Sequence, residues 1–206
     1  PQRFLPRTPL RYMRGIFYDE ACNPLSAAEV SRFLSTDSGP LVGKVCVESY
    51  GGHGVTLFRF EGGRYVSTRG EALTPEWIAA ESNSYLLQEE LEQCDFSARF
   101  NPASANTCRM VTLRCPWDNR VVVLKTVLRI GVSAGLCDNM SQGGVCACVD
   151  PEGRLSKYAC NWKAARFTEH PETHITFAGL VAPYYAEMAK TACRLAATVP
   201  YMNLLS

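Results

Sequence analysis

Alternating apolar and polar positions define the first half of the chain. The stretch "LVGKVCV" (41–47) and the stretch "GVTLFRF" (54–60) each alternate over their length, which predicts two strands separated by a glycine-rich segment. A short strand, "YVST" (65–68), follows, and "SYLLQEEL" (84–91) is strand-like at its start and polar at its end.

Three stretches carry helical signals. In "NPLSAAEVSRFLST", Ser26 precedes Glu29 by three positions, the pattern of a capping box. In "TPEWIAA", Thr74 is the predicted N-cap, with Pro75 in the first turn. The apolar spacing of "GLVAPYYAEMAKTACRLAATV" (179–199) predicts the longest helix of the chain.

The second half contains a new series of predicted strands. They are "RMVTLRC", "RVVVLKTVLRIG" and "GVCACVD", with the turn sequences "PWDN" and "DPEG" between strand runs, and a last strand begins in "YMNLLS". Residues 1–25 are rich in Pro and Arg and are predicted to be irregular. We therefore predict an α+β protein in three segments: residues 1–37 (irregular plus a helix), 38–103 and 104–206 (one α+β subdomain each).

Composition excludes several classes of protein. Hydrophobic residues make up 47% of the chain, which is ordinary for a globular protein, and the net charge of +1 gives no basic surplus for nucleic acid. No run of about eighteen apolar residues is present, so we expect no membrane span. Without a secretory signal, the chain is expected to be cytoplasmic, and nothing in it indicates an oligomeric state.

The ten cysteines contain no C-x-x-C pair, and the closest two are Cys146 and Cys148. Zinc sites usually require such pairs, and the three histidines do not replace them. We interpret the cysteines as reduced thiols that serve as small apolar residues.

The glycine-rich segment between the first two strands has two readings. It is either a tight hairpin turn or an anion-binding loop whose exposed N–H groups work together with Lys44 on the preceding strand. Its length exceeds what a hairpin needs, which favours the second reading. It is not a P-loop, because Lys44 precedes the glycines, and it is not a dinucleotide-binding motif, because no helix follows.

Motifs from both halves together resemble a known family. The ordered stretches "LVGKV", "GGHGVTLF", "LLQEEL", "NTCRMVTL", "LRIG", "DN", "GG" and "HPET" are similar to ATP-grasp enzymes of the glutamate-ligase type, and most of all to the sugar-transfer-associated ATP-grasp subgroup. The resemblance covers residues 38–206. It implies an ATP-grasp fold with the nucleotide between two α+β subdomains.

The resemblance also implies roles for particular residues. Those expected to bind ATP are Lys44 at the phosphates, the lid loop of Ser49, Tyr50, Gly51, Gly52, His53 and Gly54, and the adenine-binding strand end of Gln88, Glu89 and Leu91. Arg109 and Arg129 would neutralise charge at the γ-phosphate as catalytic residues, while Asn139, Gly143 and Gly144 would line the acceptor site. The arginines could instead be exposed strand charges, and Asp138–Asn139 could be a turn. "HPET" (170–173) is interpreted as a loop stabiliser.

One departure from the family concerns the metal. Family members end their second half with an Asp followed by Glu-x-Asn, which hold two Mg²⁺ ions, and no Glu-x-Asn occurs between residue 104 and Ser206. We therefore expect the C-terminal metal-binding segment to be missing, the Mg²⁺ ligands to lie beyond Ser206 and the chain to be a fragment.

The resemblance implies an ATP-dependent carboxylate–amine ligase that works through an acyl phosphate. Its partners would be ATP and a small-molecule or glycan-linked acceptor, and the subgroup suggests a role in cell-surface polysaccharide assembly. Two alternatives remain open: a non-catalytic nucleotide-binding module, and an ATP-grasp phosphotransferase.

Overall fold

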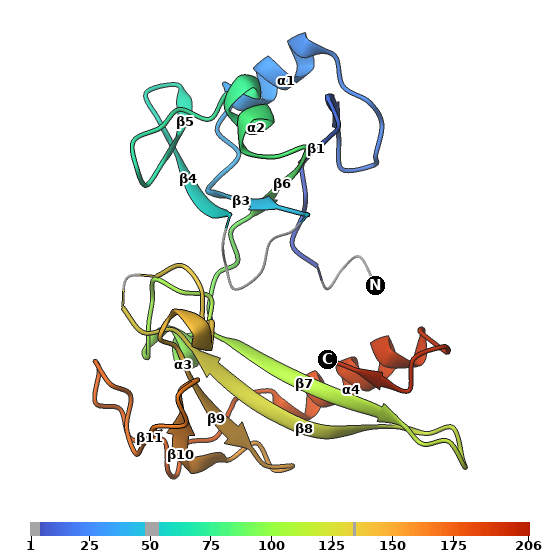
Figure 1. Cartoon of the computed structure of the whole chain (residues 1–206), viewed down its shortest axis with the longest axis vertical. Helices are drawn as coiled ribbons and strands as arrows, with labels where there is room; N and C mark the ends of the chain where they lie inside the picture. The colour runs from blue at the N-terminus through green and yellow to red at the C-terminus, as the bar shows by residue number, and fades with distance from the viewer. Residues whose placement is uncertain (1–4, 48–53, 134) are drawn as a thin grey trace. The chain divides into compact units, whose positions relative to one another are not determined.

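The computed structural model describes residues 5–47, 54–133 and 135–206. The chain divides into two compact units, Pro1–Glu92 and Gln93–Ser206, each with an antiparallel sheet and at least two helices (Figure 1). The fold is therefore α+β.

The first unit is one twisted sheet with two helices. Its described strands follow the order β2-β1-β6-β3-β4-β5, and all neighbours are antiparallel. The elements are β1 (Leu10–Met13), β2 (Ile16–Tyr18), α1 (Ala27–Leu34), β3 (Leu41–Val45), β4 (Val55–Glu61), β5 (Arg64–Ser67), α2 (Pro75–Glu81) and β6 (Ser84–Glu89).

Both helices lie on the same face of this sheet (Figure 1). Val30 of α1 and Ile78 of α2 are buried against alternate strand residues such as Leu41, Phe58 and Leu87. Because side chains alternate along a strand, the residues between these positions point to the opposite face, which carries neither α1 nor α2.

The predicted helix caps are confirmed. The Ser26 hydroxyl accepts from the Glu29 N–H, and the Glu29 carboxylate accepts from the Ser26 N–H, which completes the capping box. Thr74 caps α2 by accepting from the Trp77 N–H at 3.1 Å.

The N-terminal segment differs from the prediction. Instead of remaining irregular up to residue 25, it forms β1 and β2, and β1 pairs with β6 through Leu10–Leu87 and Tyr12–Tyr85. The strands are too short, and the Pro and Arg content around them too high, for their alternation to stand out in the sequence.

The second unit is a long β-hairpin extended on both sides into a sheet. The strand order is β11-β10-β9-β8-β7-β12 within the described residues, again antiparallel. The elements are α3 (Asp95–Ala98), β7 (Thr107–Arg114), β8 (Val121–Ile130), the 3₁₀ helix η2 (Met140–Gln142), β9 (Val145–Val149), β10 (Leu155–Cys160), β11 (Arg166–Phe167), α4 (Tyr185–Ala197) and β12 (Leu204–Leu205).

The core of the second unit explains where it begins. Phe100 stacks on Phe177 with ring centroids 6.0 Å apart, and Phe96 packs against the same cluster. The residues after Glu92 therefore belong to the second core, whereas the sequence placed the boundary at 103/104. Thr126 and Tyr185 connect β8 to α4 through their hydroxyls, 3.0 Å apart.

Gly43 is the position in β3 where a side chain cannot be accommodated. A Cβ there would lie 2.1 Å from the Tyr85 hydroxyl and 2.8 Å from the Phe58 ring. Gly43→Ala should lower the free energy of unfolding of the first unit by about 1–3 kcal/mol, because the fully buried rings must shift.

This change can be measured through one tryptophan. Trp77 packs edge-on against Phe58, whereas Trp117 and Trp162 are exposed and can be replaced by Phe. Urea unfolding followed by Trp77 fluorescence then reports the first unit. Adding Tyr85→Phe removes the closest clash and should recover part of the loss; an unchanged midpoint for Gly43→Ala would refute the packing argument.

Candidate functional site

Lys44 lies on the face of the first sheet opposite to α1 and α2. It alternates with the core-facing Gly43, and its ammonium donates to the Gln88 side-chain oxygen at 2.8 Å. Gln88 in turn donates to the Thr8 hydroxyl at 3.1 Å. The lysine is half-buried, and the partner that the described residues give it is the neutral amide of Gln88.

Apolar side chains surround this lysine on the same face. Val42, Leu57 and Leu86 occupy neighbouring register positions, with Val42 opposite Leu57 and Lys44 opposite Leu86. A strip of aliphatic side chains beside one positioned cation suits a flat apolar ring that carries an anionic tail.

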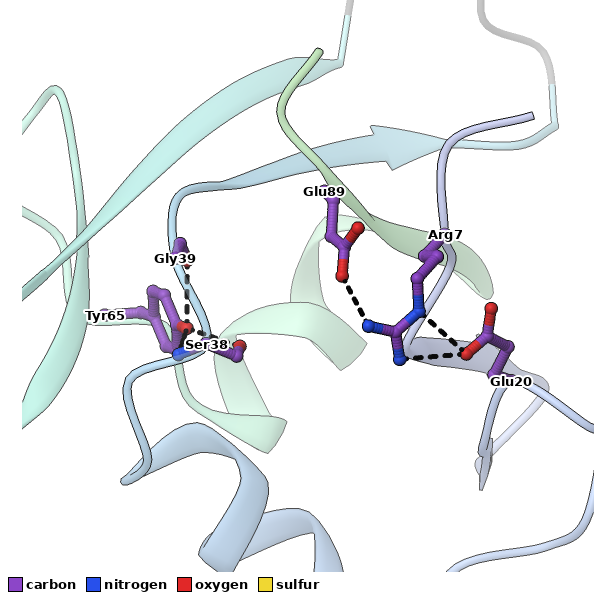
Figure 2. A network of polar contacts seen from close by, with 6 residues as sticks. All are labelled: Arg7, Glu20, Ser38, Gly39, Tyr65 and Glu89. Atoms are coloured by element: carbon purple, nitrogen blue, oxygen red, sulfur yellow. Dashed lines mark hydrogen bonds and ion pairs between the residues drawn. The ribbon is translucent and has the colours of Figure 1, made fainter. Parts of the chain in front are cut away.

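The end of β6, predicted to meet adenine, is fixed by ion pairs. Arg7 bridges Glu20 and Glu89 at 3.0 and 2.9 Å (Figure 2), and Arg59 pairs with Glu90 at 2.7 Å. The Glu89 N–H donates to the Arg7 carbonyl and the Glu90 N–H donates to the Pro40 carbonyl. These two amides are already used, so an adenine edge would have to use carbonyls here or the backbone of the exposed Leu91.

A tyrosine fixes the turn that leads into β3. The buried Tyr65 hydroxyl accepts from the Ser38 N–H at 2.9 Å and donates to the Gly39 carbonyl at 3.1 Å (Figure 2). This turn leads directly into β3, which begins at Leu41, three positions before Lys44. Tyr65 thus helps to position the lysine from the core side.

The predicted lid is only partly within the described residues. Ser49, Tyr50, Gly51, Gly52 and His53 lie outside them. Gly54 has a φ of +70° and its carbonyl accepts from the Val45 N–H at 3.0 Å, which closes the end of the β3–β4 hairpin.

In the second unit, Arg129 forms a partly buried ion pair. Its guanidinium lies 2.6 Å from Asp138, whose side chain is 8% exposed, and the Thr107 hydroxyl donates to the second oxygen of the same carboxylate. Thr107 and Arg129 are register partners on β7 and β8. Arg129 is therefore a positioned cation rather than a loose surface charge.

Arg109 lies on the same face of this sheet, two residues along β7 from Thr107, and opposite Val127. It is exposed, and its Nε donates to the Ser206 hydroxyl at 2.6 Å. Lys125, two residues before Val127 on β8, adds a third cation to this face.

The predicted acceptor residues have local structural roles. Asn139 caps η2 by accepting from the Ser141 N–H, and Gly143 ends η2 with a φ of +98°. A Cβ at Gly144 would lie 2.7 Å from the Asp138 carbonyl. These contacts agree with the alternative interpretation of Asp138–Asn139 as part of a turn. A role of Asn139, Gly143 and Gly144 in acceptor binding stays a prediction.

A polar network that the sequence did not reveal fixes the loop after β8. The Gly131 N–H donates to the Asn106 side-chain oxygen at 2.9 Å, and the Gly131 carbonyl accepts from His170 Nε2 at 3.1 Å. The backbone of Ser133 is held in the same way by Glu172 and Asn101. Asp138, the partner of Arg129, follows further along the chain.

His170 and Glu172 belong to "HPET", whose predicted role as a loop stabiliser is confirmed. His170 is fully buried, and its Nδ1 accepts from the Thr173 N–H, which leaves Nε2 to donate to Gly131. The asparagines were visible in "NPASANT", but only the fold shows which backbone groups they contact.

The described residues do not fit a Mg²⁺ site. No group of three His, Cys, Asp or Glu side chains is arranged for a metal among residues 5–47, 54–133 and 135–206, and the Asp138 oxygens are occupied by Arg129 and Thr107. The helices in these ranges are also too short or too polar to cross a membrane.

Each unit combines an antiparallel sheet with helices, the mixed α/β composition expected of an ATP-grasp protein. The family model for sugar-transfer associated ATP-grasp proteins matches residues 27–206, so the chain belongs to that family. No curated protein matches it significantly, and no solved structure does.

We predict that Asp138→Ala destabilises the second unit by about 3 kcal/mol, because it leaves a largely buried guanidinium unpaired. Hydrogen exchange of the peptides from β8 and β9 measures the loss. The matched control is Asp118→Ala, which removes an exposed turn ion pair with Arg120 and should have a much smaller effect. Equal effects of the two substitutions would show that the Asp138–Arg129 ion pair does not stabilise the second unit more than an exposed ion pair does.

Proposed function

We propose that this protein is an ATP-dependent ligase that joins a carboxylate to an amine. The observation that carries the proposal is the setting of Lys44. It is a half-buried cation held by Gln88, on the sheet face opposite to α1 and α2. It lies one residue before the end of β3, ahead of the glycine-rich segment in the sequence. Membership of the sugar-transfer associated ATP-grasp family supports it, since ATP-grasp proteins bind ATP.

The proposed ATP contacts follow from the first unit. Lys44 would bind the α- and β-phosphates, and Ser49 to Gly54 would cover them through backbone N–H groups. The purine would lie on the aliphatic strip of Val42, Leu57 and Leu86, with its edge at Gln88, Glu89 and Leu91. The ion pairs of Arg7 and Arg59 keep that strand end in place for it.

The proposed chemistry has two steps. A carboxylate oxygen of the acceptor attacks the γ-phosphorus, the bond to the β-phosphate oxygen breaks, and ADP leaves. The amine nitrogen then attacks the acyl carbon, loses a proton and expels phosphate, which forms the amide. Arg109 and Arg129 are the proposed partners of the phosphoryl oxygens, because guanidinium groups stabilise charge that develops there.

The acceptor is proposed to be a small molecule or a glycan-linked group, in keeping with the sugar-transfer association of the family. Asn139, Gly143 and Gly144 would line its site, with η2 presenting the loop. Because the reaction consumes ATP, we place it in the cytoplasm, and we link it to the assembly of cell-surface polysaccharide.

Lys44→Ala should weaken ATP binding by roughly 1.5–3 kcal/mol, the value of a charge-assisted hydrogen bond, or roughly 10- to 150-fold in Kd. Isothermal titration calorimetry with ATP measures the change. Lys163→Ala, a lysine in an exposed turn beside Trp162, is the matched control and should leave ATP affinity unchanged.

Gln88→Ala tests the positioning of the lysine. It keeps the charge of Lys44 but removes its partner, so a smaller loss of affinity is expected. If Lys44→Ala binds ATP as the unaltered protein does, Lys44 is not in the site and the proposal fails. ATP binding without phosphate release for any acceptor would favour a non-catalytic module, and phosphate left on the acceptor would favour a phosphotransferase.

A further inference from the structure

Two cysteines of the second unit face each other across adjacent strands. Cys146 of β9 and Cys160 of β10 are direct register partners in an antiparallel pair, and both are half-buried. Their neighbours Ala147 and Ala159 are also register partners and are fully buried in the core. Because side chains alternate, both thiols lie on the opposite face of the sheet.

The distance between directly opposed residues suits a covalent bond. Opposed Cα atoms in antiparallel strands lie about 4.5–5.5 Å apart. Disulfides are found at Cα separations of about 4.4–6.8 Å. The strand pairing therefore already holds these two cysteines within bonding range. Cys148 lies two residues along β9 from Cys146 and is therefore diagonal to Cys160 rather than directly opposite it.

The same cross-strand row places an arginine on each side of the thiol pair. Running across β7 to β11, the row reads Thr107, Arg129, Cys146, Cys160 and Arg166. Neighbouring cations favour the thiolate that reacts in disulfide exchange. Burial nevertheless raises the pKa of the Cys146 thiol, and Arg129 only partly opposes this rise.

We propose that Cys146 and Cys160 are a redox-active pair that forms a reversible disulfide within the second sheet. The proposal is independent of the proposed ligase function. It also revises the interpretation of these two cysteines as purely apolar residues, while leaving the other eight unchanged.

The oxidant is a small-molecule disulfide such as oxidised glutathione. Cys160, which faces Arg166, loses its proton and attacks one glutathione sulfur, forming a mixed disulfide and releasing one glutathione thiolate. The Cys146 thiol then loses its proton and attacks the Cys160 sulfur, forming the Cys146–Cys160 bond and releasing the second glutathione. Two protein thiols are oxidised and one glutathione disulfide is reduced.

The test is to incubate the protein with excess oxidised glutathione, alkylate the remaining thiols and digest with trypsin without reduction. Arg154 and Lys157 lie between the two cysteines, so cleavage leaves them on separate peptides that only a disulfide can hold together. Fragmentation by mass spectrometry places the bond. We expect the Cys146–Cys160 link in most molecules, and its loss on treatment with dithiothreitol.

Single substitutions keep the proposal falsifiable. Cys148→Ser should retain the link, Cys146→Ser should stop at a glutathione adduct on Cys160, and Cys160→Ser should acquire its adduct on Cys146 severalfold more slowly. Links from Cys148 to Cys160 at comparable yield, or a glutathione adduct on Cys160 in the unaltered protein that never resolves, would overturn the proposal.

Discussion

The antiparallel register of β3 with β4 and β6 is the constraint on which the candidate site depends. It places Leu41 and Gly43 against the helices, where Tyr85 and Phe58 leave no room for a Cβ at Gly43. The period of two then forces Lys44 onto the free face. A slip of one residue would bury the lysine and expose the glycine, so the packing of the core also fixes the chemistry of the opposite face.

In the second unit, polar rather than apolar contacts fix the backbone near the candidate site residues. A loop that leaves a strand must satisfy its backbone groups, and here Asn106, His170, Glu172 and Asn101 do so for Gly131 and Ser133. The loop continues to Asp138, which holds Arg129 on the sheet. Polar contacts thus hold both the backbone after β8 and the side chain of Arg129.

Register also governs the thiols. Cys146 and Cys160 are fourteen positions apart in the sequence, and the pairing of β9 with β10 places them opposite each other. The same pairing places Arg129 and Arg166 on either side of them. One sheet face thus carries both the arginine proposed to act on phosphate and a pair of cysteines suited to oxidation.

The capping box of Ser26 and Glu29, the Thr74 cap and the β3–β4 hairpin could all be predicted from the sequence. They depend on contacts between residues close in the chain, and the ordered motifs indicated the family. The pairing of β1 with β6, the ion pair of Asp138 with Arg129 and the contact of Gln88 with Lys44 became visible only in the folded chain. Those contacts join residues far apart in the chain, and their partners are chosen by strand order and register, which no single stretch of sequence encodes.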